Sequence, residues 1–367
     1  MPCIVNKLSP YIDDLSQLSM KSINLLLYFL FILFITACNT SSENQSTEYS
    51  NFFKSQKSGI QTGGVKLISI STPKGNFKVW TKRIGNNPKI KVLLLHGGPG
   101  CTHEYFESFE SFLPAEGIEF IYYDQLGSAY SDQPKDTSLW DLSRFVEEVE
   151  QVRIALGLTK DNFYLLGHSW GGILAMQYAL KYQTNLKGLI ISNMMASCPK
   201  YGTYANEVLS KQMPVEVLRE IKEIEAKADF SNPRYMELLN PHFYEKHILR
   251  LPTAQWPDAV KRTFKNLNGQ IYVSMQGPSE FGISGKLKKW DVSKEISKIK
   301  TPTLIIGATN DSMDPKYMEW MSSQFPNGEY VLCSQGSHMC MWDDQKHFFP
   351  GLIKFLKSDI QNKSRQN

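Results

Sequence analysis

The stretch Gly167-His168-Ser169-Trp170-Gly171 lies between the apolar run Phe163-Tyr164-Leu165-Leu166 and a helical pattern that continues from Gly172 to Tyr182. A G-x-S-x-G pentapeptide between a buried strand and a helix has the form of a nucleophile elbow, a sharp turn that exposes the serine hydroxyl. The flanking glycines leave room for the neighbouring strand and helix. Roughly one chain in ten of this length carries the pattern by chance at ordinary glycine usage, so its surroundings decide the interpretation.

Short apolar runs along the chain predict strands, most of them buried and parallel. The predicted strands are Val65–Ser71, Phe77–Ile84, Lys91–Leu95, Ile118–Tyr123, Phe163–Leu166, Leu186–Ser192, Thr303–Ile306 and Glu329–Cys333. Helical patterns separate most of them, at Leu142–Leu156, Gly172–Tyr182, Pro315–Gln324 and Gln345–Leu356. Strands that alternate with helices predict an α/β fold with a mostly parallel, doubly wound sheet.

A block of about 110 residues between Ser192 and Thr303 shows helical patterns and little strand pattern. It is too long for a simple connection, and Pro214 opens a segment within it whose apolar residues fall on one helical face. We therefore expect a helical cap over the carboxyl edge of the sheet, where ligands bind in open α/β folds. The predicted organisation is a leader (1–37), a tether (38–60), a first core part (61–192), the cap (193–300), a second core part (301–360) and a tail (361–367).

Composition and charge argue against several functional classes. The net charge is +4, hydrophobic residues make up 42% and charged residues 21%, which are values of a globular protein. No basic cluster with interleaved aromatic residues is present, so we expect no nucleic-acid partner. The cysteines form no C-x-x-C pair, and we expect neither a metal nor an organic cofactor. Cys333 and Cys340 flank a strand end; we expect free thiols there, with a disulfide as the alternative.

The N-terminal residues have the pattern of a secretory signal rather than of a folded element. Lys21 precedes the apolar run Ile23–Ile35, which is followed by Thr36-Ala37-Cys38. This ending resembles a bacterial lipoprotein signal, so Cys38 is expected to carry a lipid and to anchor the protein in the cell envelope, on the periplasmic or another extracytoplasmic side. A plain membrane anchor is the alternative, although the run is short of the roughly 20 residues that span a bilayer. Met20 stands where such signals begin, so residues 1–19 are expected to precede the true start.

Two residues that follow later strands complete a serine-based site. A serine hydroxyl needs a base, and the base needs an acid to orient it. Asp311 follows the predicted strand Thr303–Ile306, and His338 follows Glu329–Cys333, so both should meet Ser169 at one edge of the sheet. Asp314 is the alternative acid, but it is better placed to cap the next helix.

Backbone amides are expected to stabilise the oxyanion of the tetrahedral intermediate. The glycine-rich loop His96-Gly97-Gly98-Pro99-Gly100 follows a strand, and the amide of Gly98 is the predicted first donor. The second is the amide of Trp170, directly after the serine. His168 is expected to project away from the nucleophile.

Several segments resemble the proline iminopeptidase (prolyl aminopeptidase) family of α/β hydrolases. They are His96–Gly100, Asp124-Gln125-Leu126-Gly127-Ser128, Gly167–Gly172, Met275–Glu280, Trp290-Asp291 and Gly336-Ser337-His338-Met339. The resemblance implies an α/β-hydrolase fold with an inserted cap, and a serine peptidase that releases N-terminal proline, or another small residue, from short peptides. It also implies that Glu280 binds the free ammonium group of the substrate by charge-assisted hydrogen bonds.

Two positions depart from the family pattern. Ser312 stands where related tricorn-associated aminopeptidases have a second glutamate, and Leu126 stands where the family often has arginine. Asp314 and Glu237 are candidates for the missing carboxylate. An esterase or amidase for another small acyl substrate remains the alternative function, followed by a non-catalytic lipoprotein that binds a ligand under its cap.

Overall fold

The computed structural model describes residues 62–364, with side chains through residue 358. The predicted leader (1–37), the predicted tether (38–60) and the predicted lipidation residue Cys38 lie outside the described residues. No helix within 62–364 is long and apolar enough to cross a membrane.

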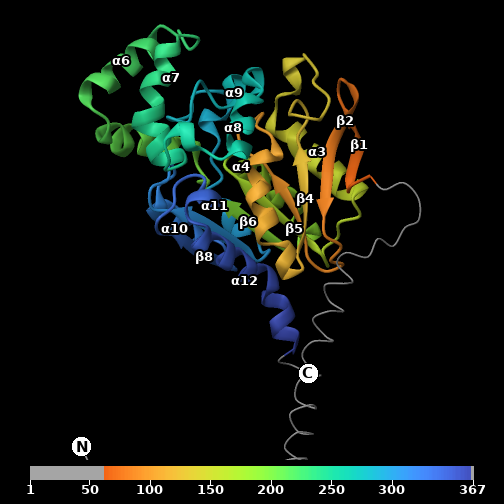
Figure 1. Cartoon of the computed structure of the whole chain (residues 1–367). Helices are drawn as coiled ribbons and strands as arrows, with labels where there is room; N and C mark the ends of the chain where they lie inside the picture. The colour runs from red at the N-terminus through yellow and green to blue at the C-terminus, as the bar shows by residue number, and fades with distance from the viewer. Residues whose placement is uncertain (1–61, 365–367) are drawn as a thin grey trace, which may run out of the picture. The chain divides into compact units, whose positions relative to one another are not determined.

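An eight-stranded sheet forms the core of the described chain (Figure 1). Its strands, in chain order, are β1 (Val65–Thr72), β2 (Gly75–Ile84), β3 (Lys91–Leu95), β4 (Glu119–Asp124), β5 (Phe163–His168), β6 (Gly188–Ser192), β7 (Thr303–Ala308) and β8 (Gly328–Cys333). The spatial order is β1-β2-β4-β3-β5-β6-β7-β8. β1 and β2, and β2 and β4, pair antiparallel, whereas all neighbours from β4 to β8 are parallel. The predicted mostly parallel sheet is therefore confirmed.

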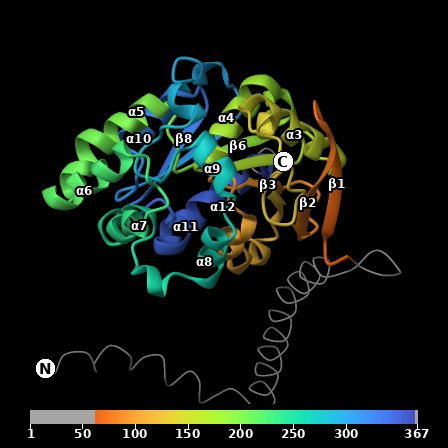
Figure 2. The same ribbon diagram turned by 90° about the horizontal axis from the view of Figure 1, so that it is seen from above.

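The sequence pattern of each strand matches its place in the sheet. Every residue of β4, β5, β6 and β7 is buried, as expected for parallel strands that helices cover on both faces. The edge strand β1 alternates instead: Ile68 and Ile70 are buried, and Leu67 and Ser69 are exposed. Figure 2 shows α3 (Leu142–Ala155) and α4 (Trp170–Tyr182) on one side of the sheet and α12 (Gln345–Ser364) on the other.

The core helices begin where capping residues stand. Asp141 precedes α3, and its carboxylate accepts the backbone N–H groups of Ser143 and Arg144 at 2.9 and 3.3 Å. Asp314 caps α10 (Pro315–Gln324) by accepting the Lys316 N–H at 2.9 Å, which satisfies groups that have no partner within the helix. Asp314 is thus engaged in capping. The short helix α11 (Cys340–Asp343) precedes α12.

The block between β6 and β7 is helical, as predicted. Its α-helices are α5 (Cys198–Tyr204), α6 (Val215–Ala226), α7 (Pro233–Leu239), α8 (Asp258–Lys265) and α9 (Gly269–Met275). Two π-helical segments, η7 (Ala205–Leu209) and η9 (Asn240–Ile248), continue α5 and α7. Pro214 precedes α6 as its N-cap instead of lying in its first turn. The other helical segments of this block are short 3₁₀ turns. A longer 3₁₀ segment, η3 (His103–Ser111), lies outside the block, between β3 and β4.

The cysteines of the described chain are free. Cys101, Cys198, Cys333 and Cys340 are all buried and none forms a disulfide. Cys333 and Cys340 flank the end of β8 as thiols.

Candidate active site

Ser169 occupies the turn between β5 and α4, and its backbone has a positive φ of 55°. A side-chain-bearing residue rarely adopts this conformation, and it persists only where the surroundings impose it. A Cβ added to Gly167 would lie 2.0 Å from the Gly171 carbonyl oxygen, and one added to Gly171 would lie 2.1 Å from that of Leu95. Both glycines are therefore required by the close approach of backbones. The turn is so sharp that α4 begins at Trp170, two residues earlier than predicted.

Asp311 and His338 form a buried pair beside this turn. Asp311 follows β7 and His338 follows β8, and Asp311 Oδ1 lies 2.8 Å from His338 Nδ1. This contact directs the other ring nitrogen, Nε2, away from the acid. Within residues 62–364, the buried Nε2 has no hydrogen-bond partner.

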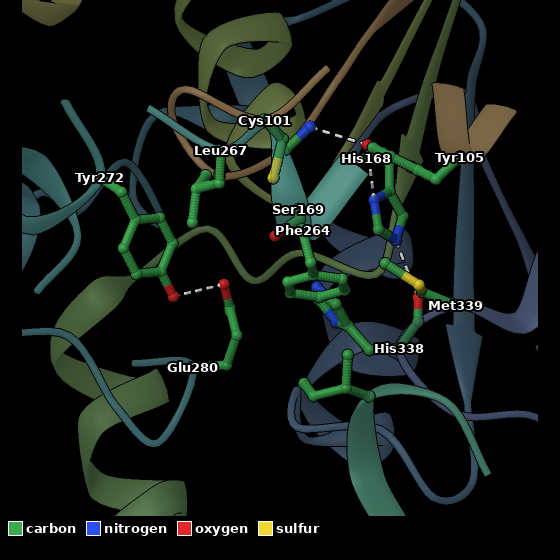
Figure 3. Close-up of a pocket in the computed structure, with 13 residues that line it drawn as sticks. Cys101, Tyr105, His168, Ser169, Phe264, Leu267, Tyr272, Glu280, His338 and Met339 are labelled. Carbon is green, nitrogen blue, oxygen red and sulfur yellow. Dashed lines mark hydrogen bonds between the residues drawn. The ribbon is translucent and has the colours of Figure 1, made fainter. Parts of the chain in front are cut away.

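A small pocket of about 20 Å³ brings the predicted residues together. Ser169, His338, Gly98 and Glu280 all line it. Figure 3 shows Ser169 between Tyr272 and Glu280 on one side and Tyr105 and His168 on the other. His338 and Ser169 thus line one cavity, but no hydrogen bond joins Nε2 to the Ser169 hydroxyl in the described chain. General-base activation requires that contact to form.

The cap holds the loop that carries His338. The backbone N–H groups of His338 and Met339 donate to the carbonyls of His247 and Ile248, both at 2.9 Å. Ser337 Oγ also donates to the Ile248 carbonyl, at 3.0 Å. Because His247 and Ile248 end the π-helical segment η9, the cap sets the position of the imidazole as well as covering it.

His168 also lines the pocket, and both of its ring nitrogens have partners other than Ser169. Its Nε2 donates to the His338 carbonyl at 2.8 Å, and its Nδ1 accepts the Tyr105 hydroxyl at 3.0 Å. Tyr105 in turn accepts the Gly97 N–H at 2.7 Å. Burial lowers the pKa of His168 well below its ordinary value, so the ring is neutral and ties the glycine-rich loop to the His338 loop. Its place inside the pentapeptide was the one signal for this role.

Opposing effects act on the charge of His338. Complete burial lowers the pKa of His338. The Asp311 carboxylate raises it, by its charge and by its hydrogen bond, and the charges of Glu280 and Asp343 act in the same direction. The net effect is a raised pKa. Buried charges act strongly on one another because little water screens them. The carboxylates therefore stabilise an imidazolium, the state that His338 reaches after taking a proton from Ser169.

The two predicted oxyanion donors come from the loop after β3 and from the start of α4. Gly98 has a φ of 105°, a conformation that favours glycine, and it lines the pocket. Trp170 is the first residue of α4, where backbone N–H groups have no partner within the helix. Gln125, which follows β4, joins the two elements: it accepts the Trp170 indole N–H at 2.9 Å and donates to the His96 carbonyl at 3.0 Å. Gln125 belongs to the segment Asp124–Ser128, whose sequence alone gave no indication of this contact.

Glu280 is the one acidic residue of the described chain that lines the pocket. It is 8% exposed, and its carboxylate accepts the Tyr272 hydroxyl at 2.7 Å. Burial raises its pKa, although His338 and the Tyr272 hydrogen bond act in the opposite direction. The Tyr244 hydroxyl accepts the Glu280 backbone N–H at 3.1 Å, so the loop after α9 is held from both sides.

The two candidates for a second carboxylate lie elsewhere. Glu237 is exposed and pairs with Arg234 at 3.5 Å, and Asp314 caps α10. Ser312 is fully buried and does not line the pocket; its hydroxyl lies 3.3 Å from His338 Nδ1 and 3.4 Å from Asp311 Oδ1. A single carboxylate therefore faces the pocket.

The rest of the pocket wall is apolar and neutral. Phe264 and Leu267 come from the cap, and Met339 comes from the loop after β8. Cys101 also lines the pocket; burial and the charge of Glu280 raise its pKa, so it is a neutral thiol. Among residues 62–364, no group of three or more metal-ligating side chains occurs. The pocket thus combines an apolar wall with one carboxylate, a serine and a histidine.

Comparisons with known proteins identify the fold and the family. The family model for the alpha/beta hydrolase fold matches residues 91–345, which confirms the predicted fold class. A proline iminopeptidase of Flavobacterium johnsoniae is 63% identical over 290 residues, covering 79% of this chain and 97% of the relative. One from Elizabethkingia meningoseptica is 61% identical over 300 residues, covering 81% and 99%. The crystal structure of a proline iminopeptidase from Mycobacterium smegmatis superposes with a TM-score of 0.69 at 26% identity, covering 79% of this chain and 98% of that one.

Asp311→Asn should lower the pKa of His338, because it removes the carboxylate that opposes the effect of burial. A base must be neutral to accept a proton, so kcat/KM of the unchanged protein should fall as the pH drops below the raised pKa. Asp311→Asn should move this fall to lower pH and cut kcat by up to about 10⁴-fold. NMR titration of labelled histidine measures the pKa directly. Asp314→Asn is the matched control and should leave the titration unchanged; an unchanged titration in Asp311→Asn would contradict the assignment.

Proposed function

The chain belongs to the proline iminopeptidase family of α/β hydrolases, and on that premise we propose that it is a serine aminopeptidase that releases N-terminal proline from short peptides. The observation that carries the proposal is one pocket in which Ser169, His338 and the buried Glu280 carboxylate meet. The first two supply the chemistry, and the third selects a substrate with a free amine.

In this proposal the reaction is an acyl transfer in two steps. Ser169 Oγ attacks the carbonyl carbon of the first residue while His338 Nε2 takes its proton. The amides of Gly98 and Trp170 stabilise the oxyanion, and His338 returns the proton to the departing amine as the peptide bond breaks. Water then attacks the acyl-enzyme, again with His338 as the base, and releases the free amino acid and the serine. Asp311 holds His338 in the required tautomer throughout.

Glu280 gives this serine hydrolase its preference for substrates with a free N-terminal amine. A substrate ammonium group that enters the pocket meets the buried carboxylate, and charge-assisted hydrogen bonds of this kind are about twice as strong as neutral ones. The Tyr272 hydroxyl holds the carboxylate from one side. A proline ring is apolar, and the side chains of Phe264 and Leu267 give the pocket an apolar wall that such a ring can contact.

Two other functions use the same site. An esterase or amidase would act on a small acyl substrate without a free amine, and a non-catalytic lipoprotein would only bind a ligand under the cap. The first needs no Glu280, and the second needs no pairing of His338 with Asp311, so substitutions at the site distinguish them.

Ser169→Ala should abolish hydrolysis of a prolyl arylamide, lowering kcat by about 10³-fold or more because the nucleophile is lost. The measurement compares the purified protein and this variant on a prolyl arylamide and on an acyl arylester. Ser323→Ala, an exposed serine on α10, is the matched control and should keep full activity. Turnover of the ester without turnover of the prolyl substrate would support the esterase instead, and full activity of Ser169→Ala would refute the nucleophile.

Glu280→Gln should lower kcat/KM for prolyl arylamide by about 10- to 100-fold, the loss of one hydrogen bond to a charged group. N-blocked substrates carry no ammonium group, so their slower hydrolysis should change little. Glu237→Gln, an exposed cap acid, is the control with no expected effect. Equal losses on free and blocked substrates would contradict the ammonium role of Glu280.

We also propose that the protein is a lipoprotein anchored in the cell envelope through Cys38. The support is the sequence alone: a lysine, a short apolar run and the ending Thr36-Ala37-Cys38. Labelled fatty acid fed to cells should be incorporated into the protein and should be lost from Cys38→Ala, but retained by Cys198→Ala. Incorporation into Cys38→Ala, or none into the unchanged protein, would refute the anchor.

A further inference from the structure

Asn193 is the first residue after β6, and its backbone adopts a positive φ of 53°. Asparagine tolerates this left-handed conformation better than most residues that carry a side chain. The backbone N–H of Asn193 donates to the Ile306 carbonyl of β7 at 2.8 Å, and its side chain is fully buried. We propose that Asn193 is a positioning residue of the reaction, which holds the Asp311 carboxylate and the His338 loop in one fixed arrangement.

The amide of Asn193 contacts both parts of the acid–base pair. Its Nδ2 donates to Asp311 Oδ2 at 2.7 Å and to the Ser337 carbonyl, directly before His338, at 3.3 Å. The side-chain amide of Asn193 thus forms hydrogen bonds both to Asp311, which follows β7, and to the loop that follows β8. The distance between the two loops sets how the imidazole faces Ser169.

The orientation of this amide is determined by its other neighbours. Asn193 Oδ1 accepts the hydroxyl of Ser192 at 2.7 Å and the thiol of Cys340 at 3.3 Å. Hydroxyl and thiol groups both donate here, so the oxygen faces them and the NH₂ group faces the carboxylate. The reverse orientation would direct the amide oxygen at a negative charge.

Without Asn193, the Oδ2 oxygen of the Asp311 carboxylate would lose its hydrogen-bond donor. Oδ1 receives His338 Nδ1 at 2.8 Å and the Met313 N–H at 3.1 Å. Asn193 is the only donor to Oδ2 among residues 62–364. A buried charged oxygen without a donor is costly, and a carboxylate held through one oxygen is free to turn away from the imidazole.

Asn193 does not line the pocket, so its effect should fall on the chemical step rather than on substrate binding. His338 is faced by Asp311 from the β7 loop, Glu280 from the cap, Asp343 from α11 and the neutral His168 from β5. Without the Asn193 donor, the Asp311 carboxylate should interact more strongly with the imidazolium, which raises the pKa of His338. The acidic limb of the kcat/KM profile should therefore move to higher pH.

Asn193→Gly and Asn193→Asp test the proposal. Glycine keeps the left-handed backbone without strain and removes the amide, whereas aspartate keeps the shape and replaces the donor by an acceptor. We expect kcat for prolyl arylamide to fall by about 10- to 100-fold in Asn193→Gly, with KM changed by less than about twofold and the acidic limb shifted upward. Asn193→Asp should shift the limb further, because it adds a second carboxylate.

The control is Cys198→Ala, which changes an equally buried residue whose nearest charged group is Asp291; kcat and the pH profile should stay unchanged. Histidine NMR titration and Tm are measured on every variant, so if Asn193→Gly does not fold, Asn193→Asp gives the result. Unchanged kcat, or an equal loss at every pH without a shift of the His338 titration, would overturn the proposal. The inference rests on the proposed function, which fails separately if the unchanged protein does not cleave prolyl arylamide.

Discussion

The close approach of three backbones at the β5–α4 turn is the constraint on which the rest of the site depends. Gly171 lies against the Leu95 carbonyl at the end of β3, and the Ser169 N–H donates to the Ser192 carbonyl at the end of β6, at 3.0 Å. Strands on both sides of β5 therefore hold the turn, and Ser169 is kept at a positive φ. Because its backbone is held, the serine hydroxyl has a fixed position against which the base, the acid and the oxyanion donors can be placed.

Buried hydrogen bonds then bring the surrounding loops to that fixed point. Tyr105 and His168 connect the glycine-rich loop with the His338 loop, and Asn193 connects that loop with Asp311. Polar contacts that water cannot reach are stronger and more directional than those at a surface. The cap adds the backbone contacts to His338 and supplies Glu280, so closing the pocket and positioning the base are parts of one structure.

The sequence predicted the features that depend on local pattern. The eight strands, the four core helices and the helical insertion all appear, because apolar runs and capping residues determine them locally. Ser169, Asp311 and His338 were found because each follows a strand that was predicted to be parallel, and the carboxyl ends of such strands share one edge of the sheet. Their catalytic roles stay predictions. The contacts of Asn193 and of His168 were not found, because they join residues far apart in the chain. Glu280 was found only through the family resemblance, and nothing local indicated that Tyr272 would hold it.

The central claim is that this turn makes Ser169 the nucleophile of the pocket. Reaction of the purified protein with a fluorophosphonate, followed by peptide mapping by mass spectrometry, tests it most directly, since the reagent bonds covalently to an activated serine. The account predicts one phosphonyl group per chain, located on Ser169. A label on another serine, such as Ser312 beside the acid–base pair, or no label on folded protein, would contradict it.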